Sequence, residues 1–243
     1  MKGYFLSLFA ASALFFFIYF IPDGLFLFAV AAGTLACGAL IFRLFGNREA
    51  LAFLLISLVY VLAFPLEHSN TIYLQAGMLF FSLYFLWDGR EKLLDVKERL
   101  WRRAADGILL FVAMVLAGAA LNLALNLAGL DDGGRAIEVV QELPLYLLVF
   151  AFTVVPVAEE LFFRALLVPL FGRFTTPLLG AALSSVFFGI THTAYGSITE
   201  IIGATALGLV LALYFVRKGD LLPCIIAHSL FNLASISVIK MLV

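Results

Sequence analysis

Long runs of apolar residues, separated by short polar breaks, extend from the start of the chain to its end. A helix needs about 20 predominantly apolar residues, within a range of about 17 to 25, to cross the hydrocarbon core of a membrane. Nine segments lie close to or within that range, at 4–21, 25–45, 50–66, 71–87, 107–130, 145–171, 177–195, 198–216 and 221–243. The pattern predicts an all-α, polytopic transmembrane helical bundle of about eight or nine spans.

The composition agrees with a membrane protein. Hydrophobic residues make up 64% of the 243 residues and charged residues only 13%, compared with about 25% charged residues in an average soluble domain. A net charge of -1 gives no sign of nucleic-acid binding. The two cysteines, Cys37 and Cys224, both fall within apolar segments, so no disulfide framework is expected.

The basic residues indicate an orientation, because cytoplasmic loops of membrane proteins collect Lys and Arg. If the N-terminus lies inside, only Arg135 and Lys240 fall in outer segments, and Arg164 falls within a span. The other twelve basic residues then lie inside, namely Lys2, Arg43, Arg48, Arg90, Lys92, Lys97, Arg99, Arg102, Arg103, Arg173, Arg217 and Lys218. The distribution predicts that the N-terminus is inside and the C-terminus outside.

One charged stretch, residues 88–106, divides the chain. It is either a solvated cytoplasmic connector or a helix lying at the membrane surface. We therefore expect accessory N-terminal spans and a charged connector over residues 1–106. A core that carries the chemistry is expected over residues 107–243, because nearly all the unusual polar residues of the spans fall there.

Three charged residues stand inside the sixth apolar segment: Glu159, Glu160 and Arg164. A charge near the centre of a bilayer costs at least roughly 2.5 to 3.5 kcal/mol, so this cluster indicates a functional site. Glu160 and Arg164 are four residues apart and share a helix face, whereas Glu159 is rotated from Glu160 by about 100°. The spacing predicts an ion pair between Glu160 and Arg164 that leaves Glu159 without a partner.

Two further polar pairs follow in later spans, Phe188 with His192 and His228 with Asn232, each four residues apart. A carboxylate such as Glu159 and an imidazole such as His192 can hold a water molecule and remove its proton as it attacks a carbonyl carbon. The side chains of His228 and Asn232 can donate hydrogen bonds to the oxyanion that then develops. Together these groups predict hydrolysis of a peptide bond within the membrane.

On these residues the chain resembles the CPBP family of intramembrane proteases, named for CAAX proteases and bacteriocin-processing enzymes and also called the Abi family. It is similar in particular to type II CAAX prenyl endopeptidases. The resemblance covers residues 145–243 and rests on three motifs in the family's order: EExxxR from Glu159 to Arg164, FxxxH from Phe188 to His192 and HxxxN from His228 to Asn232.

The resemblance implies a role for each matching residue. It makes Glu159 the catalytic glutamate, His192 its partner in activating water, and His228 with Asn232 the oxyanion hole. The residues expected to give structural support are Glu160, Arg164 and Phe188. The implied substrate is a membrane-embedded or lipid-modified protein, such as a CAAX-like prenylated one, and the implied location is a prokaryotic cytoplasmic membrane.

The resemblance leaves metal dependence open, since the family has been described both as glutamate proteases and as metalloproteases. We expect no cofactor, because the chain has no HExxH motif and Glu159, His192 and His228 offer few ligands. A divalent metal such as zinc is the alternative.

Two other functions fit intramembrane polar residues. A non-catalytic scaffold or a bacteriocin-immunity protein would retain them as a structural network. A proton-coupled transporter would use the Glu and His side chains as a relay, although the chain shows no inverted repeat.

Overall fold

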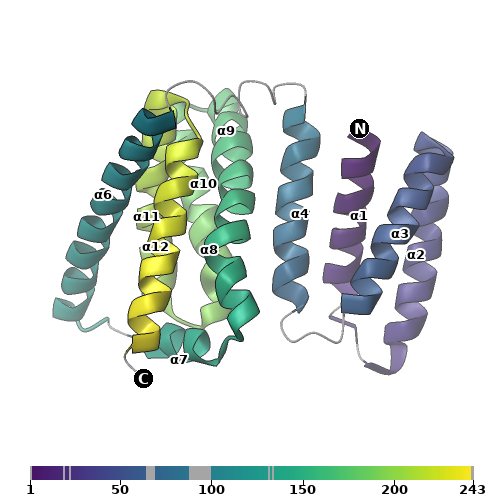
Figure 1. Cartoon of the computed structure of the whole chain (residues 1–243), viewed down its shortest axis with the longest axis horizontal. Coiled ribbons are helices and arrows are strands. Elements are labelled where there is room, and N and C mark those ends of the chain that lie inside the picture. The colour runs from purple at the N-terminus through teal and green to yellow at the C-terminus, as the bar shows by residue number, and fades with distance from the viewer. Residues whose placement is uncertain are drawn as a thin grey trace. The chain divides into compact units, whose positions relative to one another are not determined.

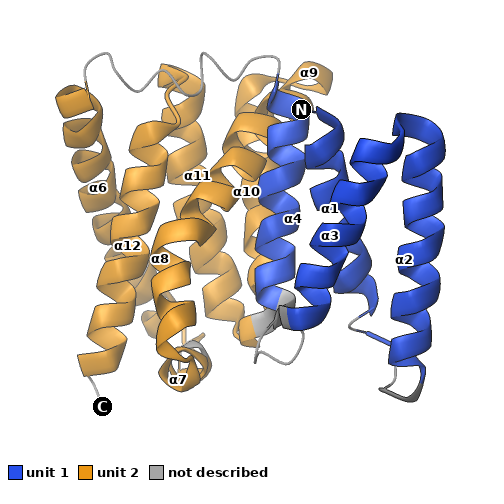
Figure 2. Ribbon diagram, turned by 45° about the vertical axis from the view of Figure 1, so that its right-hand side comes forward, with its two compact units in different colours: residues 1–90 blue, residues 91–243 orange. Residues whose placement is uncertain are grey.

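The computed structural model describes residues 2–18, 20–21, 23–63, 69–87, 100–130, 132 and 134–241. Within these residues the chain forms helices and no strand. It divides into two compact units, unit 1 at Met1–Arg90 and unit 2 at Glu91–Val243 (Figure 2). Each unit is described by itself.

The described part of unit 1 contains four helices around a core of aromatic and small side chains. The helices are α1 (Lys2–Ile18), α2 (Asp23–Phe45), α3 (Asn47–Ala63) and α4 (Ser69–Leu86), and α1 packs against the other three. Two hydrogen bonds lie inside this core: the Ser12 hydroxyl bonds to that of Tyr60, and Tyr73 donates its hydroxyl to the Tyr60 carbonyl at 2.7 Å. The described part of unit 1 buries no carboxylate, Lys, Arg or His side chain.

Unit 2 contains the remaining helices and all three predicted motifs. Its α12 packs against α6 and α8, and its α10 packs against α9 and α11 (Figure 1). The elements are α6 (Leu100–Leu127), α7 (Gly134–Glu142), α8 (Leu145–Glu159), η2 (Glu160–Leu167), α9 (Val168–Phe174), α10 (Pro177–Ile190), η3 (Thr191–Tyr195), α11 (Ile198–Lys218) and α12 (Leu222–Met241).

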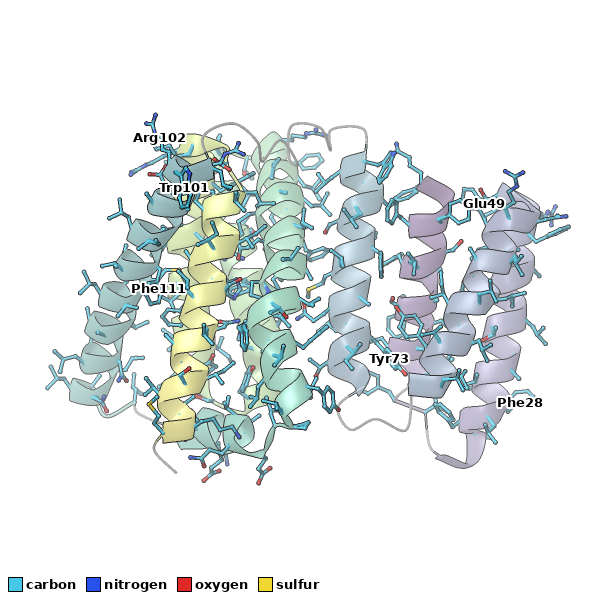
Figure 3. All side chains as sticks on the ribbon, in the orientation of Figure 1. Phe28, Glu49, Tyr73, Trp101, Arg102 and Phe111 are labelled. Atoms are coloured by element: carbon cyan, nitrogen blue, oxygen red, sulfur yellow. The ribbon has the colours of Figure 1, made fainter. Side chains whose placement is uncertain are left out.

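Among the residues that the structure describes, five helices are long and apolar enough to cross a membrane: Leu25–Phe45, Leu100–Leu127, Leu145–Phe174, Ile198–Lys218 and Leu222–Met241. Shorter apolar helices occupy Lys2–Ile18, Thr71–Leu86 and Pro177–Thr193. Large apolar side chains point outward from these helices, as Phe28 and Trp101 do with 74% and 88% of their surface exposed (Figure 3). The predicted all-α polytopic bundle is confirmed. The number of spans and the inside position of the N-terminus stay predictions.

Most of the charged connector predicted at 88–106 lies outside the described residues. Its last part, from Leu100 onward, is about the first two turns of α6, and Trp101 and Arg102 lie there side by side with exposed side chains (Figure 3). A Trp beside an Arg at a helix end is typical of the interface between a membrane and water.

The segment that carries the three charges differs from the regular α-helix predicted over 145–171. Helix α8 continues without a break into η2, which is wound as a π-helix, and the amide of Val168 donates to the carbonyl of Phe163 five residues earlier. Pro156, buried in the last turn of α8, has no N–H to give to the preceding turn, and the wider winding begins just after it. Ser184 of α10 donates its hydroxyl to the same Phe163 carbonyl at 2.7 Å, which ties α10 to the π-helix. Such wide turns occur frequently at functional sites.

Candidate active site

An ion pair lies at the centre of unit 2. The Nη1 atom of Arg164 is 3.0 Å from Oε1 of Glu160, and the two side chains are 1% and 0% exposed. The pairing predicted from their four-residue spacing is confirmed, although the helix between them is a π-helix. Arg164 also donates from Nη2 to the carbonyl of Gly208 at 3.2 Å and places its guanidinium 4.5 Å from the centre of the Phe188 ring. Three kinds of partner therefore compensate the buried guanidinium.

Gly208 of α11 leaves the space that this arrangement needs. A Cβ atom at this position would lie 2.9 Å from Cδ1 of Phe188 and 3.3 Å from Nη2 of Arg164. Gly189 does the same between α10 and α11, where a Cβ atom would lie 2.7 Å from the Ile201 carbonyl. Both glycines let neighbouring helices approach until their polar groups can touch.

His228 of α12 lies against both glutamates. Its Nδ1 is 2.8 Å from Oε1 of Glu160, the oxygen that also pairs with Arg164, and its Nε2 is 3.7 Å from Oε2 of Glu159. The side chains of His228 and Glu159 are each 7% exposed. Glu159 stays outside the ion pair of its own helix, and its neighbour is a histidine from a distant helix.

The geometry places one hydrogen of this cluster. The Nδ1 atom of His228 faces a carboxylate oxygen, which only accepts, so Nδ1 carries a hydrogen. Its Nε2 atom lies 3.7 Å from Oε2 of Glu159, beyond hydrogen-bond distance.

His192 lies in η3, just past the end of α10, and is half-buried. Its Nδ1 is 2.9 Å from the carbonyl oxygen of Phe188, and since a carbonyl only accepts, Nδ1 donates the hydrogen. The lone pair of the neutral ring is then on Nε2. This tautomer gives the site one imidazole nitrogen that can accept a proton.

The ring of Phe188 joins the three motifs. Its centroid lies 4.8 Å from that of His192 and 5.8 Å from that of His228, both in edge-to-face geometry, and its face receives Arg164. The side chain is 4% exposed. Residues from the π-helix, from α10 with η3, and from α12 thus meet around one buried aromatic ring.

Asn232 lies one turn beyond His228 on α12 and is half-buried. Its Nδ2 donates to the carbonyl of Ala151 in α8 at 2.9 Å. An amide carries two N–H groups, so this bond holds the side chain in place and leaves one donor for another acceptor. No pattern in the sequence predicts this link between Asn232 and α8.

One further residue, which no sequence motif indicated, lies beside the site. Tyr195 stacks on His192, with 5.9 Å between ring centroids and 21° between ring planes. The only signal available in the sequence was its spacing of three residues from His192.

In the part of the chain that the structure describes, no group of three or more His, Cys, Asp or Glu side chains is placed to hold a metal ion. Glu160 is paired with Arg164, and both ring nitrogens of His228 face carboxylates.

Comparison with known families gives one match. Residues 141–234 match the family described as type II CAAX prenyl endopeptidase Rce1-like. The matched residues contain all three motifs, so the resemblance inferred from those motifs is confirmed for this part of the chain. No curated protein and no solved structure matches the chain.

Proposed function

Because residues 141–234 match the type II CAAX prenyl endopeptidases, we propose that the protein is an intramembrane endopeptidase. Its substrate is a membrane-embedded or lipid-modified protein of the CAAX-like prenylated class. The observation that carries the proposal is the position of Glu159, a buried carboxylate 3.7 Å from Nε2 of His228, in a chain segment with the family's three motifs. A buried acid and imidazole of this kind are the groups that general acid–base catalysis needs.

The first step is attack by water. Glu159 takes one proton from the water while Nε2 of His192, whose lone pair is available, accepts a hydrogen bond from it. The water oxygen bonds to the carbonyl carbon of the scissile peptide, and the electrons of the C=O double bond move to its oxygen.

The second step is collapse of this tetrahedral species. The oxyanion accepts hydrogen bonds from the second N–H of Asn232 and, when the ring is protonated there, from Nε2 of His228, because Nδ1 of His228 already donates to Glu160. These bonds stabilise the charge where it develops. The proton held by Glu159 then moves to the leaving nitrogen as the C–N bond breaks. The products are a carboxylic acid and a free amine, and Glu159 is ionised again. The new acid then gives its proton to the amine, which leaves a carboxylate and an ammonium group.

Glu160 and Arg164 serve this chemistry indirectly. They fix Nδ1 of His228 through one shared oxygen and keep that imidazole turned toward Glu159. Their contribution is a fixed geometry before the substrate arrives, which is the main source of electrostatic stabilisation in enzymes.

The proposed reaction runs without a metal, because the acid and imidazole groups are engaged with one another. Activity that is lost on chelation and restored by zinc would instead identify the zinc variant.

The proposed location is a prokaryotic cytoplasmic membrane with the N-terminus inside, and unit 1 is proposed to be accessory or substrate-selecting.

The decisive experiment uses the full chain in lipid vesicles with a farnesylated CAAX peptide and with the membrane proteome of the host. We expect cleavage by the wild type, no cleavage by Glu159→Ala, and one product bond identified by mass spectrometry. Cleavage by Glu159→Ala at the wild-type rate and at the same bond would exclude the mechanism.

A non-catalytic scaffold or immunity protein is the second candidate. The mutual contacts of Glu159, Glu160, Arg164 and His228 favour it, since a purely structural network would show the same contacts. It requires that Glu159→Gln and His192→Ala keep the cellular phenotype of the wild type. Loss of the phenotype in both variants, with the protein still folded and inserted, would favour the protease.

A further inference from the structure

The loop between α6 and α7 holds the start of α11. Asp132 lies in this loop, and its carboxylate accepts four hydrogen bonds from α11's first residues. The amides of Ile198 and Thr199 donate at 2.7 Å and 3.0 Å, and the Ser197 hydroxyl at 2.8 Å. The Thr199 hydroxyl makes the fourth bond.

These bonds complete the first turn of the helix. The first N–H groups of an α-helix have no partner within the helix and need an acceptor from elsewhere. Asp132 accepts from Ile198 and Thr199, and the Ser197 hydroxyl accepts from the amide of Glu200 at 3.1 Å. A negative carboxylate is also favourable at the positive end of the helix dipole. The carboxylate is therefore the anchor of this turn.

A second bond from the same region strengthens the anchor. Nη1 of Arg135, in the first turn of α7, donates to the carbonyl of Gly196 at 3.1 Å. Gly196 ends η3 in a left-handed conformation, with φ of 65°, and lies next to Tyr195. The residues that follow η3 are thus held through both a backbone carbonyl and the helix cap.

The anchored segment is short and carries a proposed catalytic group. His192 lies four residues before Gly196, and its own Nδ1 is bonded to Phe188 on the α10 side. The 3₁₀ turn of His192 is therefore fixed at one end by α10 and at the other by Asp132. Loss of either attachment would let the imidazole turn away from the water position.

We propose that Asp132 is a positioning residue of the active site, which holds His192 in place through Ser197, Ile198 and Thr199. The inference rests on the proposed function, since it assumes that His192 acts in the reaction. Asp132 lies outside residues 141–234, the segment that matches the family, so the match assigns it no role.

The test compares Asp132→Ala with Glu138→Ala. Glu138 is an exposed carboxylate on α7 close in sequence to Asp132, so its removal changes the charge by the same amount. With a farnesylated peptide in vesicles, we expect Asp132→Ala to lower kcat by roughly tenfold to hundredfold, because small displacements of catalytic groups have effects of that size. KM should change by less than about twofold, and Glu138→Ala should match the wild type.

A spectroscopic readout makes the test independent of the substrate. The chain has three histidines, so ¹⁵N-histidine labelling in a His68→Gln background leaves only His192 and His228. In the wild type the signal of His192 should be that of the ring protonated at Nδ1. In Asp132→Ala it should shift toward an average of the two tautomers, while that of His228 stays unchanged. Asp132→Glu, which keeps the carboxylate, should restore part of both readouts.

The results separate the two proposals. If Glu159→Ala is inactive but Asp132→Ala keeps the wild-type kcat and the His192 signal, the positioning role is wrong and the proposed function stands. If Glu159→Ala is as active as the wild type, the proposed function fails, and the His192 signal alone still decides whether Asp132 holds the turn. Equal changes in the His192 and His228 signals would also overturn the inference, because they would indicate a general loosening of the fold.

Discussion

Nδ1 of His228 lies 2.8 Å from Oε1 of Glu160, and the same oxygen forms the ion pair with Nη1 of Arg164 at 3.0 Å. One carboxylate oxygen therefore neutralises the arginine and fixes the tautomer of the histidine. This link joins the first and third motifs of the chain. It gives Glu160 a defined task, since without it both the guanidinium and the imidazole lose their closest acceptor.

The first prediction concerns that link. Glu160→Gln removes the charge that compensates Arg164 and His228, and breaking a buried pair by removing one partner costs about 3 to 5 kcal/mol. The variant should unfold at a clearly lower temperature in detergent or fail to accumulate. Glu142→Gln, at an exposed carboxylate, is the control and should unfold like the wild type. Equal unfolding temperatures for both variants would show that the cluster does not stabilise the fold.

The second prediction separates Glu159 from its neighbour. Glu159→Gln keeps the size of the side chain but removes the proposed base, so the cleavage rate should fall by about 10² to 10⁴, the usual contribution of general acid–base catalysis. The unfolding temperature should fall less than in Glu160→Gln, because Arg164 keeps its partner. Rates measured on purified variants check this. A larger loss of stability in Glu159→Gln than in Glu160→Gln would contradict the division of roles.

The third prediction concerns His192, which is half-buried and bonded only to local groups in the contacts that the structure describes. His192→Ala should abolish most of the cleavage while leaving the unfolding temperature within a few degrees of the wild type. The reason is that the substitution removes the lone pair of Nε2 from the site, whereas the half-buried side chain contributes few contacts to the core. A stable variant with full activity would remove His192 from the mechanism.

The fourth prediction uses two glycines of α11. A Cβ atom at Gly208 would press against Phe188 at 2.9 Å, whereas a Cβ atom at Gly203 would meet nothing within 4 Å. Gly208→Ala should therefore destabilise the protein by about 1 to 3 kcal/mol, as overpacking does. Gly203→Ala should be neutral or stabilise it by up to about 1 kcal/mol through helix propensity. Thermal unfolding of the pair measures both, and activity should fall only in Gly208→Ala.

The fifth prediction is a pH dependence at Asp132. Hydrogen bonds from the Thr199 hydroxyl, and then from the amides of Ile198 and Thr199 and the Ser197 hydroxyl, hold the pKa of Asp132 well below its usual value of 3.8. A group with a lowered pKa in the folded state stabilises that state above its unfolded pKa and loses this effect as the pH falls toward the folded pKa. The difference in unfolding temperature between the wild type and Asp132→Asn should thus be constant above about pH 5. It should shrink as the pH falls below 3.8, the usual pKa of an Asp side chain. A difference that stays constant down to low pH would contradict an ionised carboxylate as the anchor.

The sequence was a good guide wherever a property depends on neighbouring residues. The apolar runs predicted the helical membrane bundle, because the free energy of placing a residue in lipid is set locally. The pair of Glu160 and Arg164 was predictable for the same reason, since both lie on one helix. The three motifs indicated a resemblance to the family whose model then matched residues 141–234.

The sequence failed where the winding of the helix departs from its usual period. Residues 160–167 read as part of an ordinary apolar helix, and only the structure shows the π-helix that begins after Pro156 and is held by Ser184. Winding of this kind depends on which backbone carbonyls accept a hydrogen bond from another helix. The sequence of a single segment does not predict those bonds.

By itself, then, the sequence determined the membrane helices, the Glu160–Arg164 pair and the set of candidate catalytic residues. Only the tertiary structure decided that His228, 68 positions from Glu160, lies beside both glutamates, and that Asn232 is bonded to α8. It also decided that Asp132 anchors the turn after His192. The physical reason is that contacts between helices depend on how closely the helices approach one another. At Gly208 this approach is set by Phe188, a side chain of another helix, and the residues next to Gly208 in the sequence do not indicate that neighbour.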